Sequence, residues 1–173
     1  MRRPVLATLA AIGLIFPVSS IAQAPSTSPP ITIFVVRHAE KGPEPDDPAL
    51  TEKGNRRAAE LARVLQDARV STLFATQYKR TQLTLAPLAR ALGTTTAILD
   101  AADVNGLVAK LQALPPGSRA AVASHSNLVH LIVERLSGAK VTELRDTDYD
   151  RMYVVTVGGP GIGSTAVLRY GEP

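Results

Sequence analysis

An unbroken apolar run near the start of the chain ends abruptly in charged residues. Residues 31–36, Ile-Thr-Ile-Phe-Val-Val, are apolar or β-branched and have the length of one β-strand, and Arg37 and His38 follow at once. A strand without polar alternation has both faces buried, as the strands of parallel sheets do. The run therefore predicts a central strand of a sheet that is covered on both sides, with Arg37 and His38 at its carboxyl end.

The segments that follow alternate between helix and strand patterns. Apolar residues recur at helical spacing in residues 52–67, with Thr51 as the expected N-cap. We also expect strands at 70–75, 95–99 and 119–124, helices at 80–92, 103–114 and 127–136, and a hairpin of 152–157 with 164–170 around a Gly-rich turn. This order predicts an α/β fold, a three-layer sandwich whose central sheet is mostly parallel, with helices on both faces and an antiparallel C-terminal edge strand.

The N-terminus has the pattern of a secretory signal peptide. Two arginines precede an apolar run over residues 5–16, which is shorter than the roughly 20 residues needed to span a bilayer. Cleavage after Ala22 is favoured over cleavage after Ala24, because the second cut would place Pro25 directly behind the scissile bond. We expect a periplasmic or secreted protein without a membrane span after cleavage, organised as a signal peptide (1–22), a flexible lead-in (23–30) and one domain (31–173).

Charge and cysteine content narrow the classes of function. Without the two arginines of the signal, 17 lysines and arginines stand against 15 aspartates and glutamates, and no basic run is interleaved with aromatic residues. We therefore expect no binding to nucleic acid. The chain has no cysteine, which excludes disulfides, thiolate metal sites and cysteine nucleophiles.

Polar residues suited to chemistry follow the predicted parallel strands at their carboxyl ends. Strand by strand, they are Arg37 and His38, then Arg80, then Asp100 with Asp103 close behind, then His125. The carboxyl ends of parallel strands meet at one edge of a sheet, which is where open α/β sheets bind ligands. Two histidines, two arginines and a carboxylate are therefore predicted to converge on one site.

Such a set of side chains suits a phosphate group. Guanidinium groups bind phosphate oxygens in pairs, and helices that begin directly after Arg80 and His125 would direct their N-termini toward the same anion. A neutral imidazole in this setting is a competent nucleophile for phosphorus. A second imidazole, protonated, would stabilise negative charge on the transferred group.

Three motifs in this order resemble the histidine phosphatase superfamily, the phosphoglycerate mutase-like proteins, in the branch of small members without a large cap. They are "VVRHAEKG", "TQYKRTQLT" and "VASHSNLV", and the resemblance extends over nearly all of residues 31–170. It implies a phosphoglycerate mutase-like fold and a phosphohistidine intermediate on His38. It also implies that Arg37, Arg80 and His125 hold the phosphoryl group, with Ser126 and Asn127 beside it.

The chain departs from the family pattern in two places. Ala39 stands where the family usually has glycine after the histidine, and its methyl group would narrow the site if it faced the ligand. The glutamate that serves as general acid in many members is missing after the third strand. Asp100 is the first candidate to replace it and Asp103 the second, with Glu40 or no acid at all as the alternatives. A carboxyl beside bound phosphate holds its proton more readily, and without one the enzyme would be restricted to good leaving groups.

The leading hypothesis is an exported, metal-independent phosphomonoester phosphatase that acts on a small phosphorylated substrate and needs no cofactor. One alternative is a phosphate-binding or phospholigand-binding module with weak or lost catalysis. Another is a metal-dependent phosphoesterase that uses His38, His125, Asp100 and Glu40 as ligands, against which the charge of neighbouring Arg37 argues. Residues 146–151, "DTDYDR", are interpreted as a charged loop before a strand, with a rim that selects substrate as the alternative. The sequence specifies neither the substrate nor the oligomeric state.

Overall fold

The computed structural model describes residues 28–158 and 163–172. The predicted signal peptide, most of the predicted lead-in and the middle of the Gly-rich turn lie outside these residues. The elements are β1 (Ile31–Arg37), α1 (Glu52–Leu65), β2 (Thr72–Thr76), α2 (Lys79–Leu92), β3 (Thr96–Leu99), α3 (Val104–Gln112), β4 (Arg119–Ser124), α4 (Ser126–Ser137), β5 (Arg151–Val157) and β6 (Gly163–Arg169). Each predicted element is present, with ends shifted by at most two residues.

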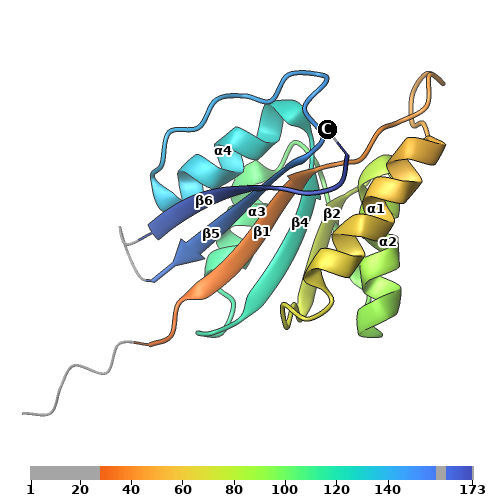
Figure 1. The fold of residues 1–173 in the computed structure, drawn as a ribbon. Coiled ribbons are helices and arrows are strands. Elements are labelled where there is room, and N and C mark those ends of the chain that lie inside the picture. The colour runs from red at the N-terminus through yellow and green to blue at the C-terminus, as the bar shows by residue number, and fades with distance from the viewer. Residues whose placement is uncertain (1–27, 159–162, 173) are drawn as a thin grey trace, which may run out of the picture.

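All six strands form one sheet in the order β3-β2-β4-β1-β5-β6 (Figure 1). The neighbours β1 and β4, β2 and β4, and β2 and β3 pair in parallel. The last two strands pair antiparallel, β5 with β1 and β6 with β5. The predicted α/β fold, with a mostly parallel sheet and an antiparallel C-terminal edge, is confirmed.

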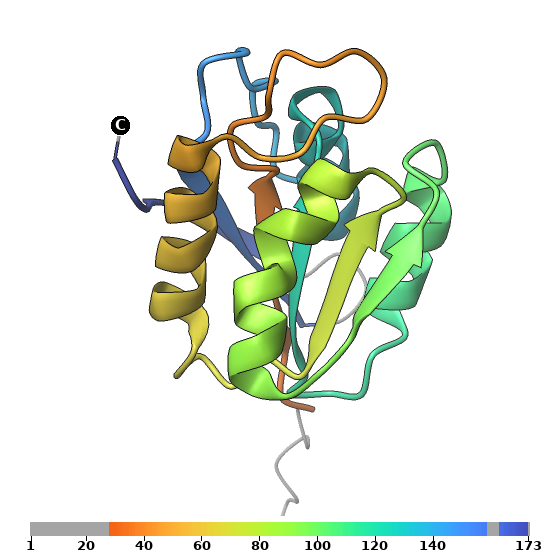
Figure 2. The same ribbon diagram turned by 90° about the vertical axis from the view of Figure 1, so that its right-hand side faces the viewer.

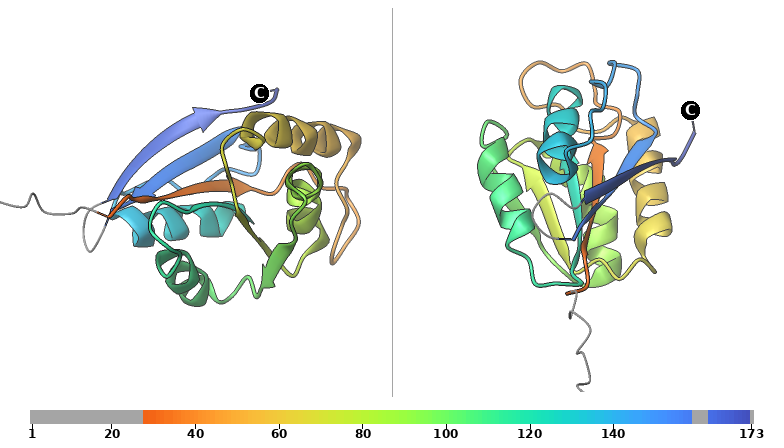
Figure 3. Two further views of the ribbon diagram at one scale, coloured as in Figure 1. Left: turned by 90° about the horizontal axis from the view of Figure 1, so that it is seen from below. Right: turned by 90° about the vertical axis from the view of Figure 1, so that its left-hand side faces the viewer.

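Helices cover both faces of the sheet, which explains the unbroken apolar run of β1. Phe34 and Val36 pack in the core under α1 and α2, which lie side by side on one face (Figure 2). Ile33 and Val35 point to the other face and pack in the core under α3 and α4 (Figure 3). Alternate residues from Ile33 to Val36 thus enter two different cores, so these four positions are all apolar.

Local signals account for the ends of the helices. The Thr51 hydroxyl accepts a hydrogen bond from the amide of Gly54 (3.1 Å), as the predicted N-cap of α1. Gly93 and Gly138 end α2 and α4 with φ values of 63° and 74°, a left-handed conformation that glycine adopts without steric cost. Within the described part of the chain, no helix is long and apolar enough to cross a membrane.

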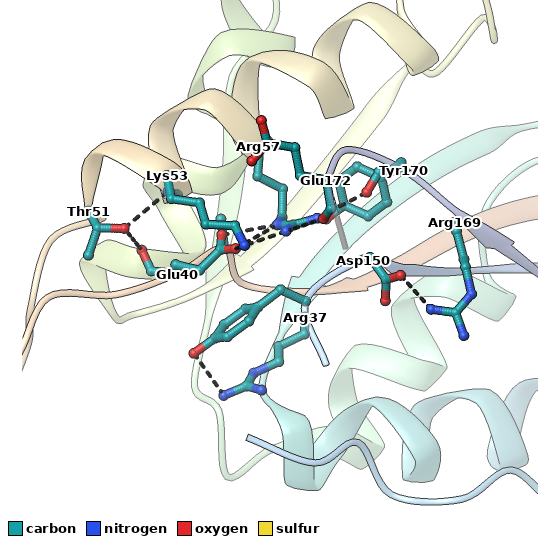
Figure 4. Close-up of polar contacts among 12 residues, drawn as sticks. Arg37, Glu40, Thr51, Lys53, Arg57, Asp150, Arg169, Tyr170 and Glu172 are labelled. Carbon is teal, nitrogen blue, oxygen red and sulfur yellow. Dashed lines mark hydrogen bonds and ion pairs between the residues drawn. The ribbon is translucent and has the colours of Figure 1, made fainter. Parts of the chain in front are cut away.

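The loop that follows β1 is fixed to α1 by a buried ion pair. The Arg57 guanidinium donates through Nε and Nη2 to the Glu40 carboxylate, at 3.0 and 2.8 Å, and Figure 4 shows Glu40 turned toward Lys53 and Arg57. Arg57 also donates to the carbonyl oxygens of Tyr170 and Glu172, so it joins this loop to the C-terminal segment. A Cβ on Gly54 would lie 2.2 Å from the Glu40 carbonyl oxygen, and the close approach of α1 to the loop therefore requires glycine there.

Candidate active site

A cavity of about 440 Å³ opens at the carboxyl ends of the parallel strands. Six residues predicted from the sequence line it: Arg37, His38, Arg80, His125, Ser126 and Asn127. The strand register explains part of this meeting, because Arg37 at the end of β1 pairs with Ser124 at the end of β4 and the next residues turn toward the cavity. The other lining residues are Lys41, Tyr78, Ala101, Ala102, Leu128 and Asp146.

The imidazole of His38 is held in one tautomer. Its Nδ1 lies 2.8 Å from the carbonyl oxygen of Ala39, and because a carbonyl can only accept, Nδ1 carries the proton. Burial lowers the pKa of His38 from 6.5 to about 3; the bond to Ala39 acts against this shift, and the nearby charges of Arg37 and Arg80 act with it. At neutral pH His38 is therefore uncharged, with a free electron pair on Nε2.

Ala39 does not line the cavity, so its methyl group does not narrow it. Its side chain is fully buried and packs with Leu50 and Ala58. Its amide donates to the Thr84 hydroxyl (2.9 Å), which itself donates to the carbonyl oxygen of Arg80. The methyl group thus points into the small core under the loop, and the backbone of Ala39 links the segments that carry His38 and Arg80.

A chain of hydrogen bonds orients His125. Arg80 Nη2 lies 3.4 Å from Nδ1 of His125, and because a guanidinium can only donate, Nδ1 accepts and Nε2 carries the proton. This Nε2 donates to the Thr76 hydroxyl (3.0 Å), which donates to the Thr81 hydroxyl (2.9 Å), which donates to the carbonyl oxygen of Tyr78 (2.8 Å). Buried hydroxyls from β2 and α2 therefore fix the ring of His125.

His125 is neutral in this arrangement. Burial lowers its pKa to about 4, and the charges of Arg80 and Arg37 lower it further in the same direction. The expectation of a protonated second imidazole concerned the site with a phosphoryl group bound, and it stays a prediction. The positive charge at the floor of the cavity comes from the two guanidinium groups.

Arg37 is buried and is held by the loop between α4 and β5. Its Nη1 donates to the carbonyl oxygen of Arg145 (2.8 Å), and its guanidinium carbon lies 4.1 Å from the centre of the Tyr149 ring. Asp146, whose side chain is almost fully exposed, lies 3.6 Å from Nη2 of Arg37. Nε of Arg37 is buried without a hydrogen-bond partner among the described residues.

Arg80 is held in a similar way from the other side. Its guanidinium carbon lies 4.3 Å from the centre of the Tyr78 ring, and Nη1 lies 3.8 Å from the Asp47 carboxylate. Nε of Arg80 is also buried without a partner among the described residues. Each guanidinium therefore stacks on a tyrosine, lies near one aspartate and keeps a free donor.

Both helix N-termini expected at the site border the cavity, but they differ in what their first N–H groups contact. Ser126 and Asn127 begin α4 beside His125, so the N–H groups of its first turn and the positive end of its dipole lie at the cavity. The N-terminus of α2 is occupied, because the amide of Lys79 donates to the Asp47 carboxylate (2.8 Å). The contribution of a helix dipole to anion binding is therefore assigned to α4.

Comparison with protein families gave a match to the first half of the described domain. The model of the histidine phosphatase superfamily (branch 1) matches residues 33–103, which contain Arg37, His38 and Arg80. Over these residues the chain is similar to this superfamily. A search of curated proteins gave no match. The superfamily supports a phosphatase as the class of enzyme.

Solved structures of histidine phosphatases share the fold. The protein histidine phosphatase SixA, solved with tungstate, superposes with a TM-score of 0.68 at 22% identity, over 80% of this chain and 96% of SixA. A putative SixA from Nakamurella multipartitia gives 0.64 at 21% identity, over 85% and 98% of the two chains. A mycobacterial glucosyl-3-phosphoglycerate phosphatase gives 0.67 at 13% identity, over 81% and 99%.

The carboxylates predicted as general acids are not among the residues that line the cavity. Asp100 accepts a hydrogen bond from the amide of Ala102 (2.8 Å), and Asp103 is the N-cap of α3, where it accepts from the amide of Gly106 (2.8 Å). Glu40 is bound to Arg57, whose hydrogen bonds lower the pKa of Glu40 although burial acts in the opposite direction. None of these three residues lines the cavity.

The four residues considered as ligands in the metal-dependent alternative do not all meet at one site. His38 and His125 are neighbours, with ring centroids 5.5 Å apart. The two carboxylates in that set, Asp100 and Glu40, are bound to a backbone amide and to Arg57. In the described part of the chain, no group of three or more His, Asp or Glu residues could hold a metal ion.

Several residues that hold the site were not predicted from the sequence. Tyr149 and Asp146 lie in the segment interpreted as a charged loop, where no local pattern marks either of them as a contact of Arg37. Thr76, Thr81 and Thr84 all lie within "TQYKRTQLT", the motif that carries Arg80. The threonine hydroxyls on both sides of Arg80 in this motif were the available signal for this network.

Proposed function

We propose that this histidine phosphatase is an exported, metal-independent enzyme that transfers a phosphoryl group to His38 and then to water. The observation that carries the proposal is the state of His38, a neutral imidazole with Nδ1 protonated and Nε2 free. It shares its cavity with two guanidinium groups that each keep an unpartnered donor. A nucleophile and an anion site in one cavity support phosphoryl transfer better than binding alone.

In the first step, the electron pair of His38 Nε2 forms a bond to phosphorus while the bond from phosphorus to the leaving group breaks. The leaving group departs with that electron pair. Arg37, Arg80 and the N-terminus of α4 hold the phosphoryl oxygens and stabilise their charge. In the second step, the oxygen of a water molecule attacks phosphorus, the P–N bond breaks, and Nε2 recovers its electron pair as phosphate leaves.

The small number of carboxyl groups that line the cavity restricts the substrates in this proposal. Of the described residues that line the cavity, Asp146 is the one with a carboxyl group, and it pairs with Arg37. The proposal assigns no general acid to the cavity, so leaving groups must depart with little help from an acid. Phosphoramidates such as N-phosphohistidine, and aryl and acyl phosphates, meet this condition. The fold shared with SixA, named a protein histidine phosphatase, supports the phosphoramidates among them.

Export is part of the proposal and depends on the signal-like segment before Gln23. The expected mature N-terminus is Gln23, with the protein recovered from the periplasm or the medium. N-terminal sequencing of the protein from fractionated cells tests this point. An intact Met1 in the cytoplasmic fraction would contradict it.

The function is tested by phosphate release from p-nitrophenyl phosphate, phosphoramidate and glycerol 2-phosphate, with His38→Ala as the blank. We expect release from the first two, little from the third, no change with excess EDTA, and no release by the variant. Full activity in His38→Ala would overturn the proposal. Loss of activity in EDTA, restored by a divalent cation, would favour a metal-dependent enzyme.

A phosphate-binding module is the second candidate. The observation that favours it is the absence of Asp100, Asp103 and Glu40 from the cavity lining. This candidate predicts that phosphate binds in calorimetry while none of the three substrates is hydrolysed. Turnover of either substrate with a good leaving group decides against it.

A further inference from the structure

The cavity has an uncharged wall beside its basic floor. Tyr78 precedes α2, Ala101 and Ala102 form the turn between β3 and α3, and Leu128 lies in the first turn of α4. These four residues carry no charge. The charged lining residues are the floor, with Arg37 and Arg80, and two rim residues, Lys41 and Asp146.

The ring of Tyr78 is fixed on two sides. It meets the His125 ring edge to face, with centroids 5.3 Å apart and an interplanar angle of 89°, and the Arg80 guanidinium stacks on it at 4.3 Å. Its carbonyl oxygen accepts from the amide (3.1 Å) and the hydroxyl of Thr81. Tyr78 is therefore a rigid, half-buried aromatic surface next to the phosphate-binding groups.

The facing turn is fixed as well, by the residue that the sequence predicted as the acid. Asp100 accepts from the amide of Ala102, and the side chain of Gln77 accepts from the amide of Ala101 (2.8 Å) and donates to Asp100 (3.5 Å). Gln77 directly precedes Tyr78, so one hydrogen-bonded unit joins the two parts of the wall. Because Ala101 and Ala102 have the smallest side chains after glycine, this unit leaves room beside the Tyr78 ring.

We propose that Tyr78, Ala101, Ala102 and Leu128 form a leaving-group subsite that selects planar, weakly hydrophilic rings such as an imidazole or a phenol. This inference rests on the proposed function. The phosphoryl group occupies the floor, between the two guanidinium groups, so the leaving group must lie in the remainder of the cavity. A ring packed against the part of Tyr78 that lines the cavity gains apolar contact and aromatic packing, whereas a polyhydroxylated group there loses hydrogen bonds to water.

The test compares two substrates with good leaving groups. The leaving group of p-nitrophenyl phosphate is an aromatic ring, and that of acetyl phosphate has no ring. For Tyr78→Ala in the full chain, we expect kcat/KM for p-nitrophenyl phosphate to fall about tenfold more than kcat/KM for acetyl phosphate, mainly through KM. Tyr78→Phe keeps the ring and should retain the wild-type ratio of the two substrates. A proportional loss on both substrates, or no loss on either, would overturn the subsite.

Tyr149 provides a matched control. It stacks on Arg37 at 4.1 Å much as Tyr78 stacks on Arg80, but it does not line the cavity. Tyr149→Ala should therefore lower activity on both substrates in proportion, with the ratio unchanged. A selective loss on p-nitrophenyl phosphate in this variant as well would assign the effect to arginine stacking and overturn the subsite.

A second variant keeps the subsite testable if Tyr78→Ala fails to fold. Ala102 is exposed, so Ala102→Leu should fold normally while it fills the space beside the ring. We expect it to weaken turnover of p-nitrophenyl phosphate at least fivefold more than turnover of acetyl phosphate, and an unchanged ratio would contradict the subsite. Activity of His38→Ala on acetyl phosphate would instead show that the proposed function itself is wrong.

Discussion

The Nδ1 atom of His38 donates a hydrogen bond to the carbonyl oxygen of Ala39, 2.8 Å away. This contact directs the remaining electron pair of the ring to Nε2, on the side of the cavity. The backbone of Ala39 is also held by α2, because the Ala39 amide donates to the Thr84 hydroxyl. The orientation of the nucleophile is thus set by main-chain geometry and by α2.

The first prediction concerns the phosphoenzyme. Mixing the protein with p-nitrophenyl phosphate and quenching in base should trap phosphohistidine substituted at Nε2, because Nδ1 is occupied by Ala39. Phosphorus NMR of the digested peptide distinguishes the two nitrogens. His38→Ala should give no phosphopeptide, and phosphate on Nδ1 would contradict the assigned tautomer.

The second prediction concerns phosphate binding by Arg80. Arg80→Lys keeps a charge but loses the planar fork, whereas Arg80→Ala loses both. Charge-assisted hydrogen bonds are worth about 1.5–3 kcal/mol each, so inhibition by inorganic phosphate should weaken about tenfold in the lysine variant and about a hundredfold in the alanine variant. Competitive inhibition assays measure both constants. Equal inhibition of all three proteins would remove Arg80 from the phosphate site.

The third prediction concerns Asp146 at the rim. Its carboxylate lies 3.6 Å from Arg37 Nη2 and would repel a phosphate bound there. Asp146→Asn should therefore bind inorganic phosphate a few times more tightly and keep its activity on p-nitrophenyl phosphate. If the variant loses activity on glycerol 2-phosphate alone, Asp146 acts as the general acid and the restriction to good leaving groups is wrong.

The fourth prediction concerns stability at mildly acidic pH. Burial lowers the pKa of His38 to about 3 and of His125 to about 4, against 6.5 in the unfolded chain. The unfolded state therefore binds more protons below pH 6.5, and stability falls as the pH drops, by up to about 1.4 kcal/mol per pH unit for each histidine. Above pH 6.5 both are neutral in either state and the effect vanishes.

Urea unfolding at pH 7 and pH 5 measures this loss. The wild-type protein should show the larger drop in unfolding free energy between the two values. His125→Asn, which has one titrating group fewer, should show about half of it. The same drop in both proteins would mean that His125 does not contribute.

The fifth prediction concerns the ion pair behind the site. Arg57→Ala leaves the Glu40 carboxylate without its buried partner and should cost about 3–5 kcal/mol of unfolding free energy. The neighbour Arg56 forms an exposed pair with Glu52, so Arg56→Ala should change stability by less than about 1 kcal/mol. Thermal or urea unfolding of the two variants compares them directly. Equal effects would show that burial of the Arg57 pair has no energetic consequence.

The order of elements was predictable because each signal is local. The apolar run of residues 31–36, the cap at Thr51 and the glycines after α2 and α4 all act within a few residues of their own position. The convergence of Arg37, Arg80 and His125 was predictable as well, because the carboxyl ends of parallel strands share an edge. The same reasoning did not identify Asp146 as the carboxylate that lines the cavity.

The sequence by itself determined the α/β order, the strand ends that carry the two arginines and two histidines, and the resemblance to the histidine phosphatases. Tertiary structure decided what each of those groups contacts. Arg37 is held by Arg145 and Tyr149, more than a hundred residues away in the chain, and Glu40 is turned toward Arg57 instead of the cavity. Such contacts depend on which side chains meet after the sheet and helices have packed, and spacing along the chain carries no information about that.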